Sequence, residues 1–245
     1  MTGGVPGAAK AAGVCLVVGA GDALGGAIAR RFAAGGCGVA VARRDRSRLE
    51  PLVADIVSRG GRALHYALDA RRPDQVAAVF AAVEADLGPL AAVVFNVGGN
   101  IRFPLVDTTD QKYFKAWEQC AQAGFLVGRE AARRMLPRQR GSILLTGATA
   151  SRRGGSGFAA FAGGKHALRA LAESMARELG PQGIHVAHVV IDGIIAGSAA
   201  PGAGAAGDDD CLVPADIAEN YWHLHCQPRN SWTFELDLRP WVERW

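Results

Sequence analysis

The segment from Val14 to Phe32, VCLVVGAGDALGGAIARRF, constrains the fold of this chain more than any other stretch. A β-branched apolar run ends at Gly19, and after a glycine-rich turn apolar residues recur at helical spacing. The segment therefore predicts a strand, a tight turn and a helix. Gly19, Gly21 and Gly25 keep the turn free of side chains, so backbone N–H groups at the helix start can approach a phosphate. Because such turns also join strands to helices for packing alone, both interpretations stay open on this segment.

Apolar runs and helical periodicity alternate along the rest of the chain. Further strands are predicted at 38–42, 63–68, 90–95, 142–146, 184–191 and 232–238. Helices are predicted at 47–59, 73–87, 109–135, 158–179 and 214–226. This alternation predicts an α/β fold of three layers, a doubly wound parallel sheet with helices on both faces and ligands at the carboxyl ends of the strands.

The length of 245 residues and the hydrophobic content of 49% suit one large core. We expect residues 1–12 to form a disordered tail and residues 13–245 to form one domain. Within it, the segment 192–213 is rich in glycine and alanine and is expected to form a lid over the cofactor. Residues 214–245 are expected to form a helix, the last strand and an aromatic tail.

Charge and cysteine content exclude several classes of function. The net charge of +4 comes from scattered arginines, which does not indicate nucleic-acid binding but suits a basic cleft for a phosphorylated cofactor. Five cysteines without C-x-x-C spacing predict reduced thiols in a cytoplasmic protein, with neither a disulfide framework nor a metal site. No apolar run reaches the ~18 residues of a membrane helix, so no membrane association is expected.

The second predicted strand leads into Arg43 and Arg44. In dinucleotide-binding folds this strand end faces the adenosine ribose, where an acidic residue binds the 2′-hydroxyl and an arginine accommodates a 2′-phosphate. The two arginines therefore favour NADP(H) over NAD(H), although solvated loop charges would give the same sequence. Asp22 in the glycine-rich turn argues the other way, since its charge would lie near the same phosphate.

The chain resembles the short-chain dehydrogenase/reductase family over nearly its whole length. The matching pieces are GAGDALG at Gly19, Asp69 after the third strand, NVGG at Asn96, GSILL at Gly141, F-x-x-x-K at 161–165, ARELGPQGIHV at Ala176 and DGII at Asp192. The resemblance implies a Rossmann fold with seven strands in the order 3-2-1-4-5-6-7. It also implies hydride exchange between a nicotinamide cofactor and a carbonyl or alcohol of a small molecule. A homodimer or homotetramer through the helices 109–135 and 158–179 is implied as well.

The predicted cofactor site consists of residues at the carboxyl ends of the strands and of further residues that the resemblance implies. Position suits Asp69 for an adenine contact, and Asn96 and Ile195 for the nicotinamide side. The full set is Gly19, Gly21, Asp22, Leu24, Gly25, Arg43, Arg44, Asp69, Ala70, Asn96, Val97, Gly98, Lys165, Gly193 and Ile195.

The resemblance also marks four catalytic positions, and three of them differ from the family pattern. In the family a tyrosine is the acid/base, a lysine lowers its pKa, a serine positions the substrate oxygen and an asparagine holds a relaying water. Lys165 matches, but the tyrosine position is Phe161, the serine position is Ala148 and the asparagine position is Cys120. Phenyl and methyl groups carry no exchangeable proton, so the family mechanism cannot operate as written. Thr149, one residue from the serine position, is a candidate substitute.

For other polar groups we expect a structural role. His185 and His188 lie on a predicted buried strand and are expected to be hydrogen-bonded core residues. Tyr221 is expected at the surface or an interface.

Three functions are compatible with these residues. The favoured one is an oxidoreductase with a modified acid/base site, because Lys165 and most cofactor motifs remain. The alternatives are a pseudoenzyme that binds the cofactor without redox chemistry, and a non-redox enzyme that reuses the pocket.

Overall fold

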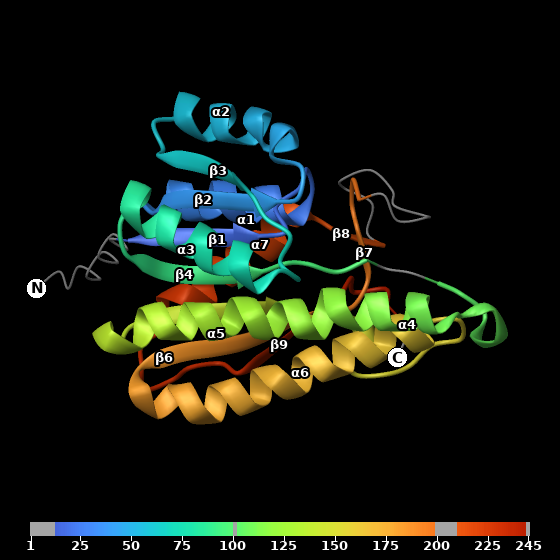
Figure 1. The fold of residues 1–245 in the computed structure, drawn as a ribbon. Helices are drawn as coiled ribbons and strands as arrows, with labels where there is room; N and C mark the ends of the chain where they lie inside the picture. The colour runs from blue at the N-terminus through green and yellow to red at the C-terminus, as the bar shows by residue number, and fades with distance from the viewer. Residues whose placement is uncertain (1–12, 100–101, 199–209, 244–245) are drawn as a thin grey trace, which may run out of the picture.

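The computed structural model describes residues 13–99, 102–198 and 210–243 (Figure 1). The predicted tail at 1–12, half of the predicted lid (199–209) and Trp245 lie outside the described residues.

A parallel sheet of seven strands forms the centre of the molecule, in the order β3-β2-β1-β4-β5-β6-β9. The strands are β1 (Val14–Val18), β2 (Gly38–Arg43), β3 (Ala63–Ala67), β4 (Leu90–Phe95), β5 (Gly141–Thr146), β6 (Ile184–Ile191) and β9 (Glu235–Leu238). The doubly wound fold and its strand order are therefore confirmed. The strand order reverses between β1 and β4, which is where such sheets open a crevice at their carboxyl ends.

Two helical layers bury the two faces of the sheet. One core joins the sheet to α1 (Leu24–Ala34), α2 (Glu50–Ser58) and α7 (Pro214–Cys226). The other joins it to α3 (Pro73–Leu87), α5 (Ala123–Met135) and α6 (Ala159–Leu179). Figure 1 shows α5 and α6 running side by side beneath the sheet, with α4 (Asp110–Trp117) at the end toward which the strands point. The apolar periodicity of the sequence sets this arrangement, because each helix buries one stripe.

Short helical turns connect these elements. The 3₁₀ turns are η1 (Arg46–Leu49), η2 (Leu105–Asp107), η4 (Leu136–Arg138), η5 (Thr149–Ser151) and η6 (Gly180–Gln182). The predicted helix 109–135 is present over 110–135, and its middle part, η3 (Glu118–Gln122), is a π-helix. This turn faces Gly164 of α6, where an added Cβ would lie only 3.1 Å from Cys120 Cβ. The π turn arises where the helices come close together, and local periodicity does not reveal such a contact.

Two other predictions need correction. The lid was expected to have no regular structure, yet β7 (Ile194–Ile195) pairs with β8 (Cys211–Leu212), a pairing too short to give a periodic signal. Tyr221 is not a surface residue: it is 0% exposed, and its hydroxyl lies 2.7 Å from Thr146 Oγ1. The expectation that His185 and His188 are buried is confirmed.

Candidate active site

The glycine-rich turn packs directly against the segment that follows β4. Gly19 has φ +89°, and a Cβ there would lie 2.5 Å from the carbonyl oxygen of Asn96. The Asn96 side-chain amide in turn donates to the Gly19 carbonyl at 3.1 Å. At Gly21, by contrast, a Cβ would meet nothing within 4 Å. The turn is thus fixed on one side and open on the other.

The start of α1 offers unsatisfied backbone donors. Its N-cap residue Ala23 provides no side-chain cap, and no acidic residue lies in the first turn, which begins at Leu24. Gly25 must lack a side chain, since a Cβ would lie 2.7 Å from Ala20 Cα. Asp22 is exposed just before the helix. Free N–H groups beside open space fit the diphosphate of a dinucleotide.

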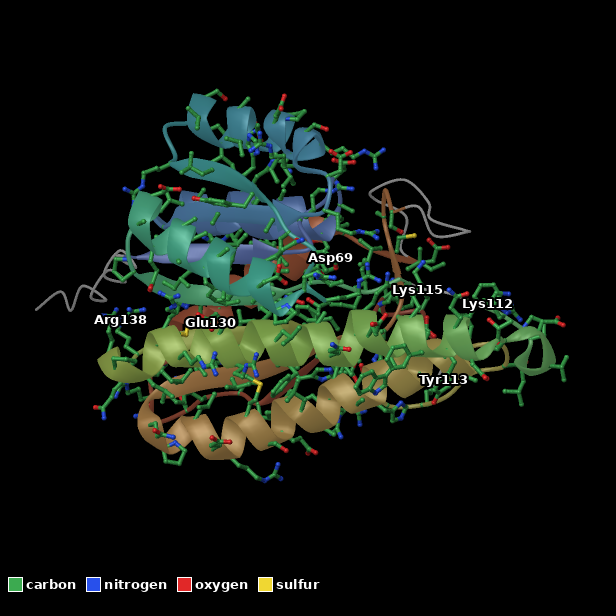
Figure 2. All side chains as sticks on the ribbon, viewed as in Figure 1. Asp69, Lys112, Tyr113, Lys115, Glu130 and Arg138 are labelled. Carbon is green, nitrogen blue, oxygen red and sulfur yellow. The ribbon has the colours of Figure 1, made fainter. Side chains whose placement is uncertain are left out.

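The predicted residues at the ends of β2 and β3 lie near one another but have different partners. Asp69 binds Arg71 through both carboxylate oxygens, at 2.9 Å and 2.6 Å, and this pairing lowers the pKa of Asp69. Within the described residues, neither Arg43 nor Arg44 forms an ion pair, so their charges remain available. Figure 2 shows Asp69 at the end of the sheet toward which α4 extends. No motif in the sequence indicates the Arg71 pairing, which only the folded backbone defines.

Lys165 on α6 reaches the carboxyl ends of the strands and is 4% exposed. Its ammonium donates to the Thr146 carbonyl at 2.8 Å, and burial lowers its pKa. A Cβ at Gly98 would lie 3.0 Å from Lys165 Nζ and 4.0 Å from Cys120 Sγ. Burial raises the pKa of the Cys120 thiol, an effect that Lys165 opposes. The structure thus brings together Gly98, Cys120 and Lys165.

The other catalytic positions surround Lys165 with apolar groups. Phe161 is buried with Cys120, and Ala148 packs against the same cluster. The Phe161 ring centroid lies 5.8 Å from Lys165 Nζ. These side chains bring no acidic hydroxyl to the ammonium group, so any proton exchange here needs another donor.

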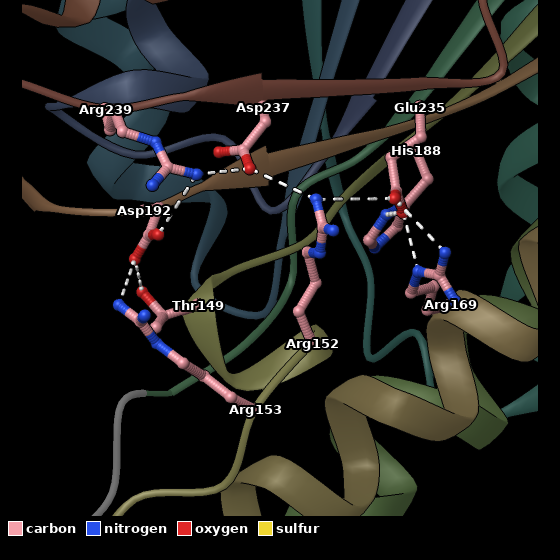
Figure 3. A network of polar contacts seen from close by, with 9 residues as sticks. All are labelled: Thr149, Arg152, Arg153, Arg169, His188, Asp192, Glu235, Asp237 and Arg239. Atoms are coloured by element: carbon pink, nitrogen blue, oxygen red, sulfur yellow. Dashed lines mark hydrogen bonds and ion pairs between the residues drawn. The ribbon is translucent and has the colours of Figure 1, made fainter. Parts of the chain in front are cut away.

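Asp192, at the end of β6, is the centre of a polar cluster that sequence reasoning did not foresee (Figure 3). The Thr149 hydroxyl donates to Asp192 Oδ1. Arg153 lies 3.6 Å from the same carboxylate, and Arg239, beyond β9, lies 3.5 Å from it. Thr149 and Arg153 follow β5, whereas Arg239 lies beyond β9, so these partners come from distant segments of the chain.

Next to this cluster, Glu235 of β9 forms the second half of the network in Figure 3. Its carboxylate accepts from Arg169 at 2.6 Å and lies 3.0 Å from His188 Nδ1. Arg152 is 3.9 Å from Glu235 and 3.2 Å from Asp237. Burial lowers the pKa of His188 to about 4, so the imidazole is neutral near pH 7.

The last predicted cofactor residues lie close to the polar cluster or in the core. Gly193 touches the C-terminal segment, since a Cβ there would lie 2.6 Å from Pro240 Cδ. Ile195 pairs with Leu212 in the small sheet. Val97 and Ala70 pack into the core on the α3 side.

A hollow of about 700 Å³ lies between the segments that follow β4 and β5, and Arg102, Leu105 and Ser156 are among its lining residues. Another, of about 740 Å³, runs along α1 and α7 with Arg31 and Glu219 in its wall. We regard the former as the substrate side, because its residues belong to the loops beside Ala148. Among the described residues, no group of His, Cys, Asp and Glu side chains could hold a metal ion. None of the described helices is both long and apolar enough to cross a bilayer.

Comparison with known proteins identifies the family. The family model "short chain dehydrogenase" matches residues 13–200, and the chain belongs to this family of oxidoreductases. A short-chain dehydrogenase from Rhodopseudomonas palustris has a similar structure, with 48% identity, a TM-score of 0.82 and coverage of 94% of this chain and 99% of that one. A metagenomic short-chain oxidoreductase in complex with NADP is 28% identical, with a TM-score of 0.81 and coverage of 94% and 97%.

Characterised relatives share a smaller part of the chain. Gluconate 5-dehydrogenase of Gluconobacter oxydans (strain 621H) is 29% identical over 171 residues, which cover 70% of this chain and 67% of that protein. A short chain dehydrogenase of Pseudocercospora fijiensis (strain CIRAD86) is 31% identical over 172 residues, 69% of this chain. The chain spans only 55% of that relative's length.

Proposed function

We propose that this protein is an NADP(H)-dependent oxidoreductase that acts on a carbonyl or alcohol of a small molecule through a modified acid/base site. The observation that carries the proposal is the buried Lys165, next to Gly98 at the carboxyl ends of the strands. A lysine is costly to bury, and this one has a single backbone acceptor, which suits a group that binds a further polar ligand.

The cofactor part of the proposal rests on how the glycine-rich turn, the start of α1 and the end of β2 suit NADP(H). The open space at Gly21 and the uncapped start of α1 suit the diphosphate, and Arg43 and Arg44, which form no ion pair within the described residues, suit a 2′-phosphate. The relative crystallised with NADP supports the same choice. When bound, the cofactor would supply or accept a hydride, and Lys165 would hold its ribose. Asp69, Asn96 and Ile195 would contact the remainder of the cofactor, while Ala70 and Val97 would support the site from the core.

The modified acid/base site rests on the side chains around Lys165. Phe161 and Ala148 occupy the positions of the tyrosine and serine in the resemblance, and Cys120 that of the asparagine. Lys165 therefore keeps its role in orienting the cofactor, while the proton must move through a different group.

The test is a screen of ketones, aldehydes and secondary alcohols by nicotinamide absorbance, run beside the double variant Ala148→Ser with Phe161→Tyr. We expect the wild type to turn over at least one substrate, and Lys165→Ala to abolish that turnover. Tight NADPH binding without turnover in the wild type, together with new carbonyl reduction in the double variant, would contradict the proposal.

That contrary result would establish the second candidate, a pseudoenzyme that binds the cofactor. The apolar cluster of Phe161, Cys120 and Ala150 favours this candidate, because it excludes polar groups from the place where an acid/base would lie. A non-redox enzyme on the same fold has no comparable support in the site.

We also propose a homodimer or homotetramer in the cytoplasm. Phe114, Trp117 and Phe125 are 55%, 38% and 44% exposed along α4 and α5, and burying them would favour self-association. The absence of a disulfide among the five cysteines, all of which lie in the described residues, suits a reducing compartment. Light scattering should detect the oligomer, and Trp117→Glu should shift it toward monomer. A stable wild-type monomer at micromolar concentration would contradict the assembly.

A further inference from the structure

We propose that Thr149 and Asp192 form the proton relay of this enzyme, and that Arg239 of the C-terminal segment positions it. The inference rests on the proposed oxidoreductase function and names the groups that would replace the missing phenol. Both residues lie at the carboxyl edge of neighbouring strands, Thr149 three residues after the end of β5 and Asp192 one residue after β6.

The direction of the hydrogen bond decides what the pair can do. Thr149 donates its hydroxyl proton to Asp192, so the lone pairs of Thr149 Oγ1 remain to accept a proton from a ligand. Thr149 is only partly buried and directly follows Ala148, whereas the side chain of Asp192 is 8% exposed. The hydroxyl therefore faces outward from a carboxylate that lies behind it.

Other proton-carrying groups nearby are already engaged or sealed off. Tyr221 is fully buried on the α7 side, and burial raises the pKa of its hydroxyl. Ser151 is 1% exposed, and its oxygen accepts from the Ala148 N–H. Cys120 is buried, with a raised thiol pKa. His188 is buried against Glu235 and is neutral.

Two arginines lie against the Asp192 carboxylate and orient it. Arg239 is 15% exposed and lies 3.5 Å from it, while the more exposed Arg153 lies 3.6 Å away (Figure 3). Arg239 is itself fixed by Asp237 of β9, and Pro240 packs on Gly193 beside the carboxylate. The C-terminal segment thus orients the relay although it carries no reacting atom, which makes Arg239 a positioning residue.

The chemistry balances in the direction of alcohol oxidation. The substrate hydroxyl loses its proton to Thr149 Oγ1, and Thr149 passes its own proton to Asp192. The carbinol C–H bond breaks at the same time, with its electron pair leaving as hydride to the oxidised cofactor and a carbonyl forming. Asp192 then releases the proton to solvent past the exposed Arg153. Carbonyl reduction follows the same path in reverse.

The experiment measures single-turnover hydride transfer from an alcohol identified in the screen, in H₂O and D₂O and across pH. Thr149→Val should slow transfer by about 10²–10⁴-fold and abolish the solvent isotope effect, whereas Thr149→Ser should stay within a few-fold of the wild type. Asp192→Asn should slow transfer similarly and also abolish the solvent isotope effect, because the amide cannot accept the proton from Thr149. NADPH affinity, measured by calorimetry, should stay within a few-fold in all three variants.

A matched control is available in Asp55, a carboxylate that also lies between two arginines, at 2.5 Å from Arg30 and 2.8 Å from Arg59. Asp55→Asn should leave the rate and its pH profile unchanged. Arg239→Lys should retain more of the rate than Arg239→Ala.

The outcomes distinguish a failure of the proton relay from a failure of the proposed function on which it rests. Wild-type rate and isotope effect in Thr149→Val would overturn the relay alone. A lowered melting temperature in Asp192→Asn with an unchanged transfer rate and isotope effect would make the cluster a structural clamp and also overturn the relay. A wild-type chain that binds NADPH but transfers hydride from no alcohol and to no carbonyl would overturn the proposed function, and the relay with it.

Discussion

The two halves of the carboxyl edge of the sheet are built on different principles. At β1 and β2 the site consists of backbone: Gly19 and Gly25 permit contacts that any side chain would block. At β5, β6 and β9 it consists of charged and polar side chains, with Asp192 just beyond the end of β6 and Glu235 at the start of β9 as the two centres. Under the proposed function, the first half would hold the cofactor and the second would carry the acid/base chemistry. The two halves would then differ because diphosphate recognition by a turn tolerates little change, whereas acid/base chemistry can be moved to other groups.

The largest effect should come from substitutions in the glycine-rich turn, which forms the backbone half of the edge. Gly19→Ala places a Cβ 2.5 Å from the Asn96 carbonyl oxygen at a φ of +89°, so we expect a loss of about 3 kcal/mol in unfolding free energy and loss of NADPH binding. Gly21→Ala, with nothing within 4 Å, should keep its stability but still weaken NADPH. Urea denaturation and calorimetric titration measure both. Equal stability of the two variants would show that the turn is not constrained by Asn96.

The side-chain half should be more sensitive to acid. Burial lowers the pKa of His188 to about 4, against 6.5 for a free imidazole. Between these pH values the unfolded chain binds more protons, so the contribution of neutral His188 is complete above pH 6.5 and is lost as the pH falls toward 4. The loss should reach about 2–3 kcal/mol. His225, whose pKa burial also lowers to about 4, should add a similar loss.

Urea denaturation near neutral pH and near the acid end of this window measures the effect. His188→Gln should flatten its share of the pH dependence, while exposed His223→Gln should not. An acid dependence as steep in His188→Gln as in the wild type would mean that carboxylates, not this imidazole, set the stability of the β6–β9 end.

Cofactor choice should depend on the end of β2. Arg43→Ala should weaken NADPH by about 2 kcal/mol, roughly 30-fold, and leave NADH nearly unchanged, because only NADPH carries the 2′-phosphate. Arg177→Ala, an exposed arginine at the far end of α6, is the matched control. Equal losses of affinity for both cofactors, or no loss for either, would show that Arg43 is only a surface charge.

The difference between the two halves of the edge also explains how far each could be predicted from the sequence. The glycine turn and the alternation of strands and helices could be predicted, because local spacing and periodicity define them, whereas the strand order was implied by the family resemblance. Cys120 could be placed in the site but not on a π turn, since that turn arises from contact with Gly164. Arg153 and Arg239 could not be assigned to Asp192, because their partnership exists only after β9 has joined the sheet. Charged side chains from distant segments leave no periodic signal.

The smallest effect tests whether β5 transmits a disturbance from one face of the sheet to the other. Thr146 binds the Tyr221 hydroxyl through its side chain at 2.7 Å and Lys165 through its carbonyl at 2.8 Å. Tyr221→Phe leaves the Thr146 hydroxyl without this buried partner, so we expect a loss of about 1 kcal/mol in unfolding free energy. The change should appear as a lower urea midpoint at constant slope.

NADPH affinity should not change in Tyr221→Phe, because the carbonyl that accepts from Lys165 belongs to the backbone and the strand on both sides of it stays paired. Tyr113→Phe, at a tyrosine that is 47% exposed, should have no measurable effect on either quantity. If Tyr221→Phe instead weakened NADPH several-fold, the α7 face would be coupled to Lys165, and the two halves of the carboxyl edge would not be independent.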